Sequence, residues 1–263
     1  MSSLPIKKKS VREFILLSLL DSAKDLAALV EEGEKRIGTT ISHDLKKLEI
    51  SKSIVKSNGV CSLTSRGLVE AQICKSYYAS VDVLDCYQDF WLTHDISRIP
   101  PTLMVDIGDL SGSTLLTATP ADLYFVHSHF VKVLHSAKAV QALAPIYHPD
   151  YAAAFRERLN SGIKIQLIAT PTVIEKIEKE APDLLSKYVT TGDFQLLVKE
   201  DLGIAMAVTD SCYTFGLFDL NKRYDNNANM FGYGLKGLLW ASRLFTLTLL
   251  DSVPYVYSNS TFI

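Results

Sequence analysis

The sequence has few of the features that mark secreted, metal-binding or membrane proteins. Its 263 residues include 4 cysteines. None of them belongs to a CxxC pair, and the histidines show no zinc-ligand spacing. Free thiols are typical of a reducing compartment. No run of about 18 apolar residues is present, and the apolar stretch after the lysines at positions 7–9 is interrupted by charged residues. We expect a cytoplasmic protein with no membrane span and no bound metal.

Charge is unevenly distributed along the chain. The formal net charge is -2. Residues 1–66 hold 12 Lys and Arg against 8 Asp and Glu, whereas the remainder holds 15 against 21. A modestly basic N-terminal segment therefore precedes an acidic one, which is compatible with an anionic partner for the first segment only.

The N-terminal segment is predicted to form three helices. Ser10 and Glu13 have the spacing of a capping box, and "KDLAALVEE" is a second helix that ends at Gly33. In "IGTTISHDLKKLEI" the apolar side chains recur with helical spacing and form one narrow core stripe. The stripe consists of Ile37, Ile41, Leu45 and Leu48.

The opposite face of the third helix carries cations and short polar side chains, as a helix in the major groove requires. Taken alone, such a face more often belongs to a solvated structural helix. The residues that follow favour DNA binding, because "SIVKSNGVCSL" contains two β-rich runs around Asn58-Gly59, a hairpin signal. Three helices and a hairpin predict a winged helix-turn-helix.

This segment also resembles the ArsR-like regulators, over about residues 10–70. In them a stretch of the form S-x-H-L-K-x-L precedes a short hairpin and a T-x-x-G ending; here Asp44 separates His43 from Leu45. The resemblance implies a DNA-binding module. We expect phosphate contacts from the basic side chains and base contacts from the short polar ones. The predicted DNA-binding residues are Arg36, Thr39, Thr40, Ser42, His43, Lys46, Lys47, Lys52, Lys56 and Arg66.

A long helical pattern without proline runs from Ser65 to about Leu92. Its length exceeds what one small domain needs, so it either links two domains and packs against a second copy of the chain, or packs on its own body. The prediction is a winged helix at 1–66, a linker or dimerisation helix at 67–98, and a third domain at 99–263. A two-fold homodimer would present two reading helices about one DNA turn apart.

Beyond Pro100-Pro101, helical and strand-like runs alternate. The order predicts a parallel pair crossed by helices, then three β-rich runs as an antiparallel extension, "DFQLLV", "GIAMAVTD" and "CYTFGLFD". The expected fold class is α/β, or α+β overall, with a mixed sheet. The blocks "PIYHPDYAAAFRERLNSGIKIQLIATPTVIEKI", "LGIAMAVTDSCYTFGLFDLNKRYD" and "LLWASRLF" resemble the effector-side domain of archaeal FilR-type methanogenesis regulatory proteins, which implies a transcriptional regulator.

The C-terminal segment somewhat resembles phospholipase D-like domains as well, whose phosphoryl transfer needs a His-x-Lys pair. No lysine stands two residues after His127, His129 or His148. No G-x-S-x-G elbow, glycine-rich phosphate loop or H-E-x-x-H motif is present either. We therefore expect no enzyme activity and no cofactor.

A ligand pocket is expected beyond the carboxyl ends of the strands. Its predicted lining is Tyr147, His148, Asp219, Arg223, Tyr224 and Asp225, although the stretch 219–225 also reads as a solvated turn. The resulting hypothesis is a regulator that binds double-stranded DNA and senses a small molecule or a partner. The alternative is an adaptor or enzyme whose winged helix docks a protein, since a net charge of +4 over residues 1–66 is modest for a DNA-binding module.

Overall fold

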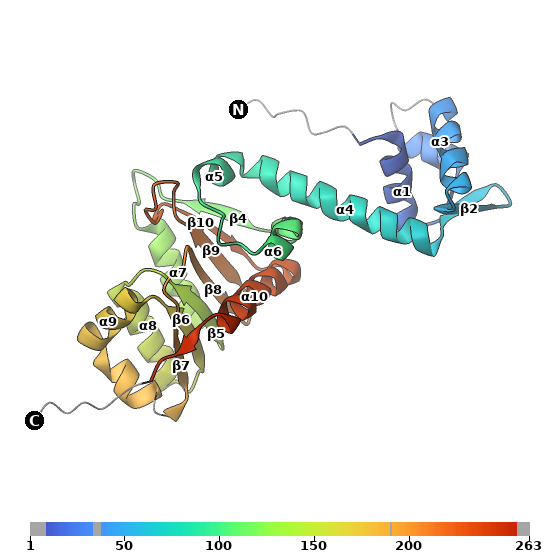
Figure 1. Ribbon diagram of the computed structural model, residues 1–263. Helices are drawn as coiled ribbons and strands as arrows, with labels where there is room; N and C mark the ends of the chain where they lie inside the picture. Colours follow the sequence, from blue (N-terminus) through green and yellow to red (C-terminus); the bar gives the residue numbers. More distant parts are fainter. Residues whose placement is uncertain (1–8, 34–37, 190, 257–263) are drawn as a thin grey trace, which may run out of the picture. The chain divides into compact units, whose positions relative to one another are not determined.

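The computed structural model describes residues 9–33, 38–189 and 191–256. The chain divides into two compact units, residues 1–85 and 86–263, and Figure 1 labels their elements. We call them the N-terminal unit and the C-terminal unit.

The N-terminal unit is a winged helix. Its elements are α1 (Val11–Asp21), β1 (Lys24–Asp25), α2 (Leu26–Glu32), α3 (Gly38–Ile50), β2 (Ile54–Ser57), β3 (Val60–Leu63) and α4 (Ser65–Cys86). The capping box is confirmed: the Ser10 side chain accepts the Glu13 amide proton, and the Glu13 carboxylate accepts that of Ser10 at 2.8 Å. Strand β1, which the sequence analysis did not predict, pairs with β3 and completes a three-stranded sheet in the order β1-β3-β2.

The predicted hairpin is confirmed between β2 and β3. Asn58 and Gly59 have φ values of 49° and 84°, the left-handed conformation that a tight two-residue turn of this twist requires. The two strands pair in antiparallel register from Ile54 with Leu63 to Ser57 with Val60. Asn58 and Gly59 are both exposed, so the tip of the hairpin is accessible to solvent.

Helix α4 ends earlier than predicted. The pattern from Ser65 to about Leu92 is interrupted at Tyr87, and a separate helix α5 (Gln88–Thr93) follows. The interruption has a tertiary cause: the Tyr87 hydroxyl donates to the Ser113 carbonyl, and Phe90 is buried in the C-terminal unit. The boundary between the units at Asp85 falls inside the predicted linker 67–98, so the division into three domains is a prediction that the compact units do not reproduce.

The start of α4 packs on the winged helix. Ala71 is fully buried, and the Tyr78 hydroxyl donates to Glu13 at 2.7 Å. A Cβ at Gly67 would lie 1.8 Å from the Ser53 carbonyl oxygen, so only glycine permits this approach of helix and wing. Helix α4 therefore belongs to the N-terminal unit over most of its length.

The C-terminal unit is built on an eight-stranded mixed sheet with the order β11-β7-β6-β5-β8-β9-β10-β4. Its strands are β4 (Thr114–Thr117), β5 (Val140–Ala144), β6 (Ile165–Ala169), β7 (Phe194–Val198), β8 (Ile204–Thr209), β9 (Tyr213–Leu217), β10 (Ala228–Gly232) and β11 (Val253–Pro254). The other elements are α5, α6 (Pro101–Val105), the 3-10 turn η1 (Ile107–Leu110), α7 (Phe125–Ser136), α8 (Pro149–Asn160), α9 (Pro171–Glu180), the π-helical turn η2 (Leu184–Val189) and α10 (Leu235–Leu250). The predicted α/β class with a mixed sheet is confirmed.

One strand direction was predicted incorrectly. "DFQLLV" forms β7, which runs parallel to β6, and β6 runs parallel to β5. Helix α9 and turn η2 carry the chain back before β7 begins, so this strand enters in the same direction as its neighbour. The strands β8, β9, β10 and β4 form an antiparallel part on the other side of β5, and β11 pairs antiparallel with β7 at the opposite edge.

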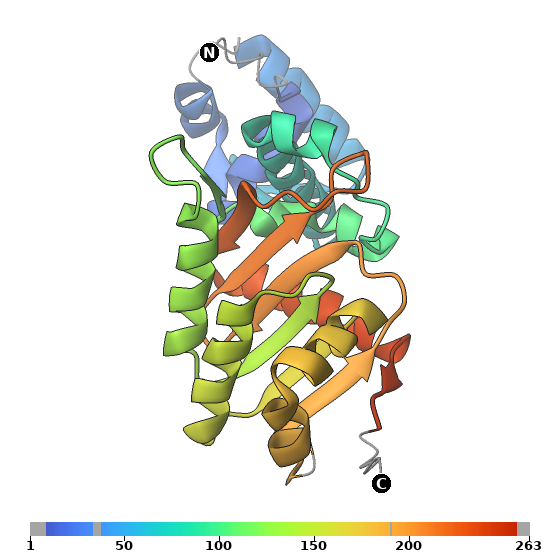
Figure 2. The same ribbon diagram turned by 90° about the vertical axis from the view of Figure 1, so that its left-hand side faces the viewer.

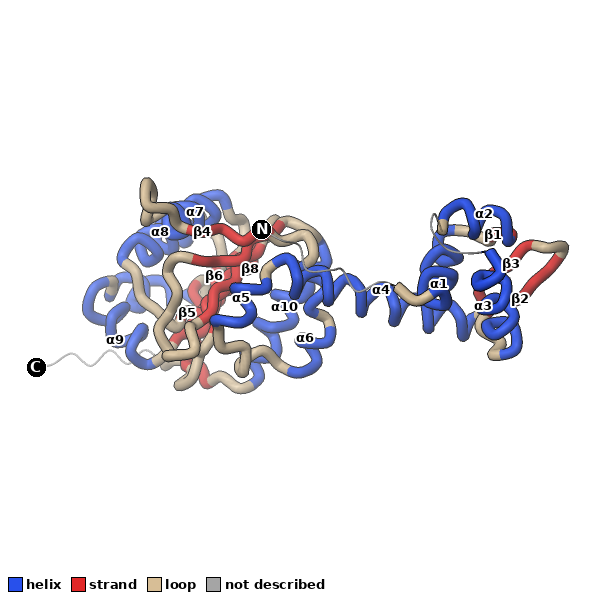
Figure 3. Tube along the Cα trace, turned by 90° about the horizontal axis from the view of Figure 1, so that it is seen from above, coloured by secondary structure: helices blue, strands red, loops and turns tan. Residues whose placement is uncertain are grey.

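Helices cover both faces of this sheet (Figures 2 and 3). Helices α7, α8 and α9 pack on one face over a core that includes Leu134, Phe155 and Ile177. Helix α10 packs on the other, where buried Trp240 meets Phe215 edge to face with ring centroids 5.5 Å apart. No helix among the described residues is both long and apolar enough to cross a membrane.

Candidate nucleic-acid interface and ligand pocket

Helix α3 is held by the predicted apolar stripe. Ile41 and Leu48 are fully buried and Leu45 is 8% exposed, packed with α1, α2 and the wing. Ile37, the first member of the stripe, and Arg36, a predicted DNA contact, lie outside the described residues. The stripe fixes which side of α3 faces solvent.

The solvent side of α3 carries the predicted contacts. Thr39, Thr40, His43, Lys46 and Lys47 are exposed and Ser42 is half-buried. Asp44 lies at the edge of this face, where one of its carboxylate oxygens is 3.3 Å from Lys47 Nζ and 3.6 Å from His43 Nδ1. Among the described residues, no carboxylate lies within ion-pair distance of the Lys46 ammonium. The face is therefore cationic and rich in hydrogen-bond donors, with one acidic residue at its margin.

The wing adds two exposed cations, and a third is held at its base. Lys52 follows α3 with a φ of 62°, and Lys56 lies on β2. Arg66 is exposed, but its Nε donates a hydrogen bond to the Glu70 carboxylate at 2.8 Å. The same carboxylate also accepts hydrogen bonds from the Ser53 hydroxyl and the Arg12 guanidinium group. The hydrogen bond from Arg66 lowers the pKa of Glu70. Glu70 thus ties α4 to Ser53 at the base of the wing and to Arg12 of α1, and Arg66 is its partner within α4, a role that the position of Arg66 in the sequence did not reveal.

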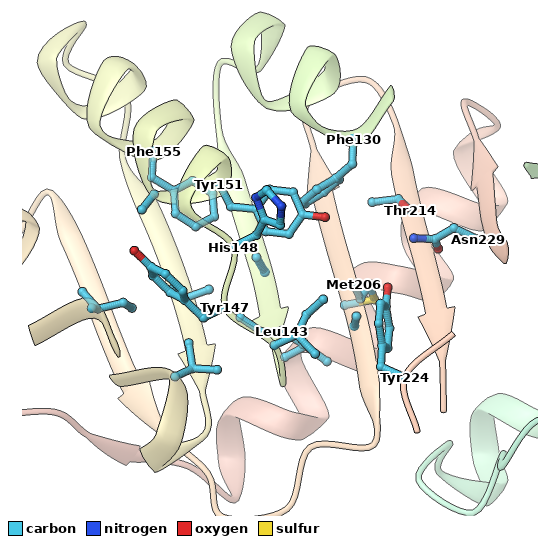
Figure 4. A pocket seen from close by; sticks show the side chains of 18 of the residues that line it. Phe130, Leu143, Tyr147, His148, Tyr151, Phe155, Met206, Thr214, Tyr224 and Asn229 are labelled. Carbon is cyan, nitrogen blue, oxygen red and sulfur yellow. The ribbon is translucent and has the colours of Figure 1, made fainter. Parts of the chain in front are cut away.

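The C-terminal unit contains a pocket between α7, α8, α9 and the sheet (Figure 4). Its cavity volume is about 60 Å³. It opens into a cleft of about 480 Å³ that shares Phe130, Tyr147, His148, Tyr151, Tyr224 and Asn229 with it. An apolar chamber with a few polar groups is the usual form of a small-molecule site.

Three of the six predicted ligand residues line this pocket. They are Tyr147, His148 and Tyr224. Asp219 is used in a turn, where its Oδ1 accepts the amide protons of Asn221 at 2.8 Å and Arg223 at 2.9 Å.

The other two predicted residues also lie away from the pocket lining. Arg223 Nε forms an ion pair with Asp219 Oδ2 at 3.3 Å. Asp225 Oδ2 accepts a hydrogen bond from Nε2 of the buried His94 at 3.1 Å. The predicted placement of Asp219, Arg223 and Asp225 in the pocket was therefore wrong, because the backbone of the turn and His94 already engage these charged groups. The solvated-turn alternative describes Asp219 and Arg223.

The polar groups of the pocket on β9 and β10 were not predicted from the sequence. Thr214 and Asn229 are 6% and 8% exposed. Strand β10 was not predicted, since "ANMFG" follows an Asn-rich stretch that reads as a loop. An asparagine flanked by apolar residues in a β-rich run was the signal available.

One group of side chains has metal-ligand geometry. Single ligand atoms of His127, His148 and Asp150 lie within 4.8 Å of one another. Each is already engaged: His127 Nε2 contacts Asp150 Oδ2 at 2.9 Å, and His148 Nδ1 accepts the Asp150 amide proton at 3.2 Å as the N-cap of α8. His127 Nδ1 also meets the Tyr151 hydroxyl at 3.1 Å. We interpret the group as a hydrogen-bonded clamp between α7 and the start of α8.

His129, two residues after His127 on α7, provides a pH-dependent element. Its Nε2 is buried without a hydrogen-bond partner in the described structure, and burial lowers the pKa of the ring. A lowered folded-state pKa means that the unfolded chain binds the proton more readily. The stability from neutral His129 is thus complete above the unfolded value, about 6.5, and is lost as pH falls through it.

We therefore expect the unfolding free energy of the wild-type protein to fall between about pH 7 and 5, with a shallower fall in His129→Leu. Urea denaturation across this range measures it. His135→Leu is the control, because His135 is exposed and paired with Glu157 at 2.8 Å. Equal pH slopes for His129→Leu and the wild type would contradict the assignment.

Most of the C-terminal unit, which contains the pocket, is similar in sequence to known proteins. Residues 123–249 match the family model described as "Methanogenesis regulatory protein FilR1, middle domain". The chain is 27% identical over 214 residues to methanogenesis regulatory protein FilR1 of Methanothrix harundinacea (strain 6Ac), covering 79% of this chain and 48% of that protein. The chain thus spans about half the length of the curated relative it matches.

Similar solved structures are more distant. An archaeal chromatin protein, TrmBL2, has a TM-score of 0.46 at 11% identity, covering 95% of this chain and 96% of that one. Nuc, a phospholipase D family member from Salmonella typhimurium, has a TM-score of 0.40 at 13% identity, covering 55% and 99%. Scores of this size do not establish a common fold over the whole chain. The sequence matches are the informative ones, and by them residues 123–249 are similar to the middle domain of the FilR1-type methanogenesis regulatory proteins.

Proposed function

We propose that the chain is a transcriptional regulator that binds double-stranded DNA through α3 and the wing, acts as a homodimer, and senses a small molecule in the pocket of the C-terminal unit. The observation that carries DNA binding is the exposed face of α3. Thr39, Thr40 and His43 stand beside Lys46 and Lys47, directly opposite a buried apolar stripe. On this proposal the threonines and the histidine approach base edges, and the lysines of α3 and the wing contact phosphates.

Three observations support a regulator over an enzyme. The curated relative is itself named a regulatory protein. The histidines of α7 and α8 lack the His-x-Lys pairing needed for phospholipase D-like chemistry. His127 and Asp150 bond to each other, and the pocket beside them is lined mainly by apolar side chains, so it is suited to holding a ligand. The proposed role of the pocket is to make DNA affinity depend on that ligand.

The proposed homodimer rests on an apolar stripe along α4. Val69, Ile73 and Leu84 are 60%, 64% and 43% exposed. At about 100° per residue they fall within an arc of about 60°. Such a stripe on a charged chain is costly in water, and a second copy of the same helix would cover it by two-fold symmetry.

Ile73→Glu tests this stripe. We expect the variant to sediment as a monomer where the wild type sediments as a dimer, because a carboxylate at the centre of an apolar interface loses its hydration. Lys75→Glu, exposed on the far side of α4, places the same side chain away from the stripe and is expected to remain dimeric. A dimeric Ile73→Glu would reject this interface.

Selection from a random duplex library tests the function as a whole. Full-length protein is expected to enrich an inverted repeat whose half-sites are about one helical turn apart, 10–10.5 base pairs from centre to centre. Enrichment of no sequence, together with equal retention of all duplexes, would reject sequence-specific regulation and favour the adaptor alternative.

A further inference from the structure

The pocket has an apolar end and a polar end (Figure 4). At the apolar end, Phe155 of α8, Leu167 of β6 and Ile177 of α9 are at most 7% exposed, and Leu184 of η2 is fully buried. At the polar end, Thr214 of β9, Asn229 of β10 and Tyr224 lie together. Any molecule that fills the pocket meets both surfaces.

Asn229 is the informative group at the polar end. It is 8% exposed, and its Oδ1 accepts no hydrogen bond from any described part of the chain. Buried polar atoms are nearly always satisfied, since an unpaired one is costly. The amide faces the pocket, so a hydrogen-bond donor on a bound molecule would satisfy it.

Gly216 keeps this end open. A Cβ on Gly216, in the middle of β9, would lie 2.6 Å from the Tyr224 hydroxyl and 3.2 Å from both polar atoms of the Asn229 amide. The absence of a side chain in a strand interior often marks a close approach by another group. Here it leaves room for the two polar side chains at the mouth of the chamber.

The lining carries no formal charge. No lysine, arginine, aspartate or glutamate is among its residues. Burial lowers the pKa of His148 and raises the pKa of Tyr151 to about 12, so both are neutral near pH 7. A charged molecule would lose its hydration in the chamber and gain no counter-ion, which is strongly unfavourable.

We propose that the pocket binds an uncharged small molecule, with an apolar part against α8 and α9 and a hydrogen-bond donor that meets Asn229. The uncharged lining thus discriminates against ions whatever their shape. The assignment of a ligand class deepens the proposed sensing function and rests on it only for the coupling to DNA.

The test uses three planar probes of the same heavy-atom count that differ in charge: benzamide, benzoate and the benzamidinium cation. Binding to the full-length protein is measured by ligand-observed NMR titration. We expect benzamide to bind at millimolar concentration with a Kd at least about tenfold lower than either ion. Equal or tighter binding of an ion would overturn the proposal, as would failure of all three to bind.

Two variants locate the site. Gly216→Val is expected to abolish benzamide binding, whereas Gly112→Val, where a Cβ meets nothing within 4 Å, retains it. Asn229→Asp at alkaline pH is expected to reverse the ranking, so that benzamidinium binds more tightly than benzamide. A reversal is a gain of binding and cannot arise from misfolding. Unchanged ranking in Asn229→Asp would remove Asn229 from the site.

DNA affinity with saturating benzamide is a separate measurement. If benzamide binds as expected and DNA affinity is unchanged by it, the ligand class is correct and sensing by this molecule is rejected. If benzamide does not bind and the protein still binds DNA, the ligand proposal fails and the DNA-binding proposal is unaffected.

Discussion

Lys46→Glu combined with Lys47→Glu is expected to remove most DNA affinity at low salt. Both ammonium groups are on the exposed face of α3, opposite buried Ile41 and Leu48. Each lysine that contacts a phosphate releases a counter-ion, and reversal of its charge replaces attraction by repulsion. In a dimer four lysines change, so the slope of log affinity against log salt is expected to become shallower by about 3.6. Fluorescence anisotropy with a labelled duplex measures both quantities.

The matched control is Lys138→Glu with Lys164→Glu. Both lysines are exposed in the C-terminal unit, so this variant changes the net charge equally without touching α3. We expect its affinity to stay close to that of the wild type. If the two double variants lost affinity equally, net charge would govern binding, and the assigned reading face would be wrong.

Trp240→Ala is expected to destabilise the C-terminal unit by about 3–5 kcal/mol, the usual cost of truncating a buried large aromatic side chain. Trp240 is fully buried, its indole Nε1 donates to the Leu103 carbonyl at 2.9 Å, and its ring packs edge to face on Phe215. The truncation leaves a cavity between α10 and β9 and an unpaired carbonyl on α6. Urea denaturation followed by circular dichroism measures the change in the transition of this unit.

Leu239→Ala serves as the control, because Leu239 is 55% exposed and adjacent on the same helix. Its expected cost is below about 1 kcal/mol. Similar costs for the two variants would mean that α10 is not held against the sheet through Trp240, contrary to the described packing.

Local signals predicted the N-terminal unit well. The Ser10–Glu13 capping box, the Asn58-Gly59 turn and the spacing of Ile41, Leu45 and Leu48 each depend on residues near one another in the sequence, and the structure confirms all of them. The end of α4 was harder to predict. It depends on the bond from Tyr87 to Ser113, which is a tertiary contact that no helical periodicity records.

The pocket was predictable in part, for a similar reason. Tyr147 and His148 lie three and four residues after the last residue of β5, where ligand sites in α/β sheets are expected, and both line the pocket. Asp219 and Arg223 also follow a strand, but their side chains form an ion pair, and Asp219 accepts a backbone amide proton of the turn. Asn229 was missed because its importance lies in what it lacks, a hydrogen-bond partner, and this can be seen only in three dimensions.

The salt dependence of DNA binding by the full-length protein tests the central claim most directly. Lys46, Lys47, Lys52 and Lys56 are exposed, so a dimer offers eight phosphate contacts, and at about 0.9 per contact the slope of log affinity against log salt is expected to be about −7. Arg66 is left out because Glu70 holds it. A straight line of about this slope is the predicted result. An affinity that does not change with salt would contradict DNA binding through α3 and the wing.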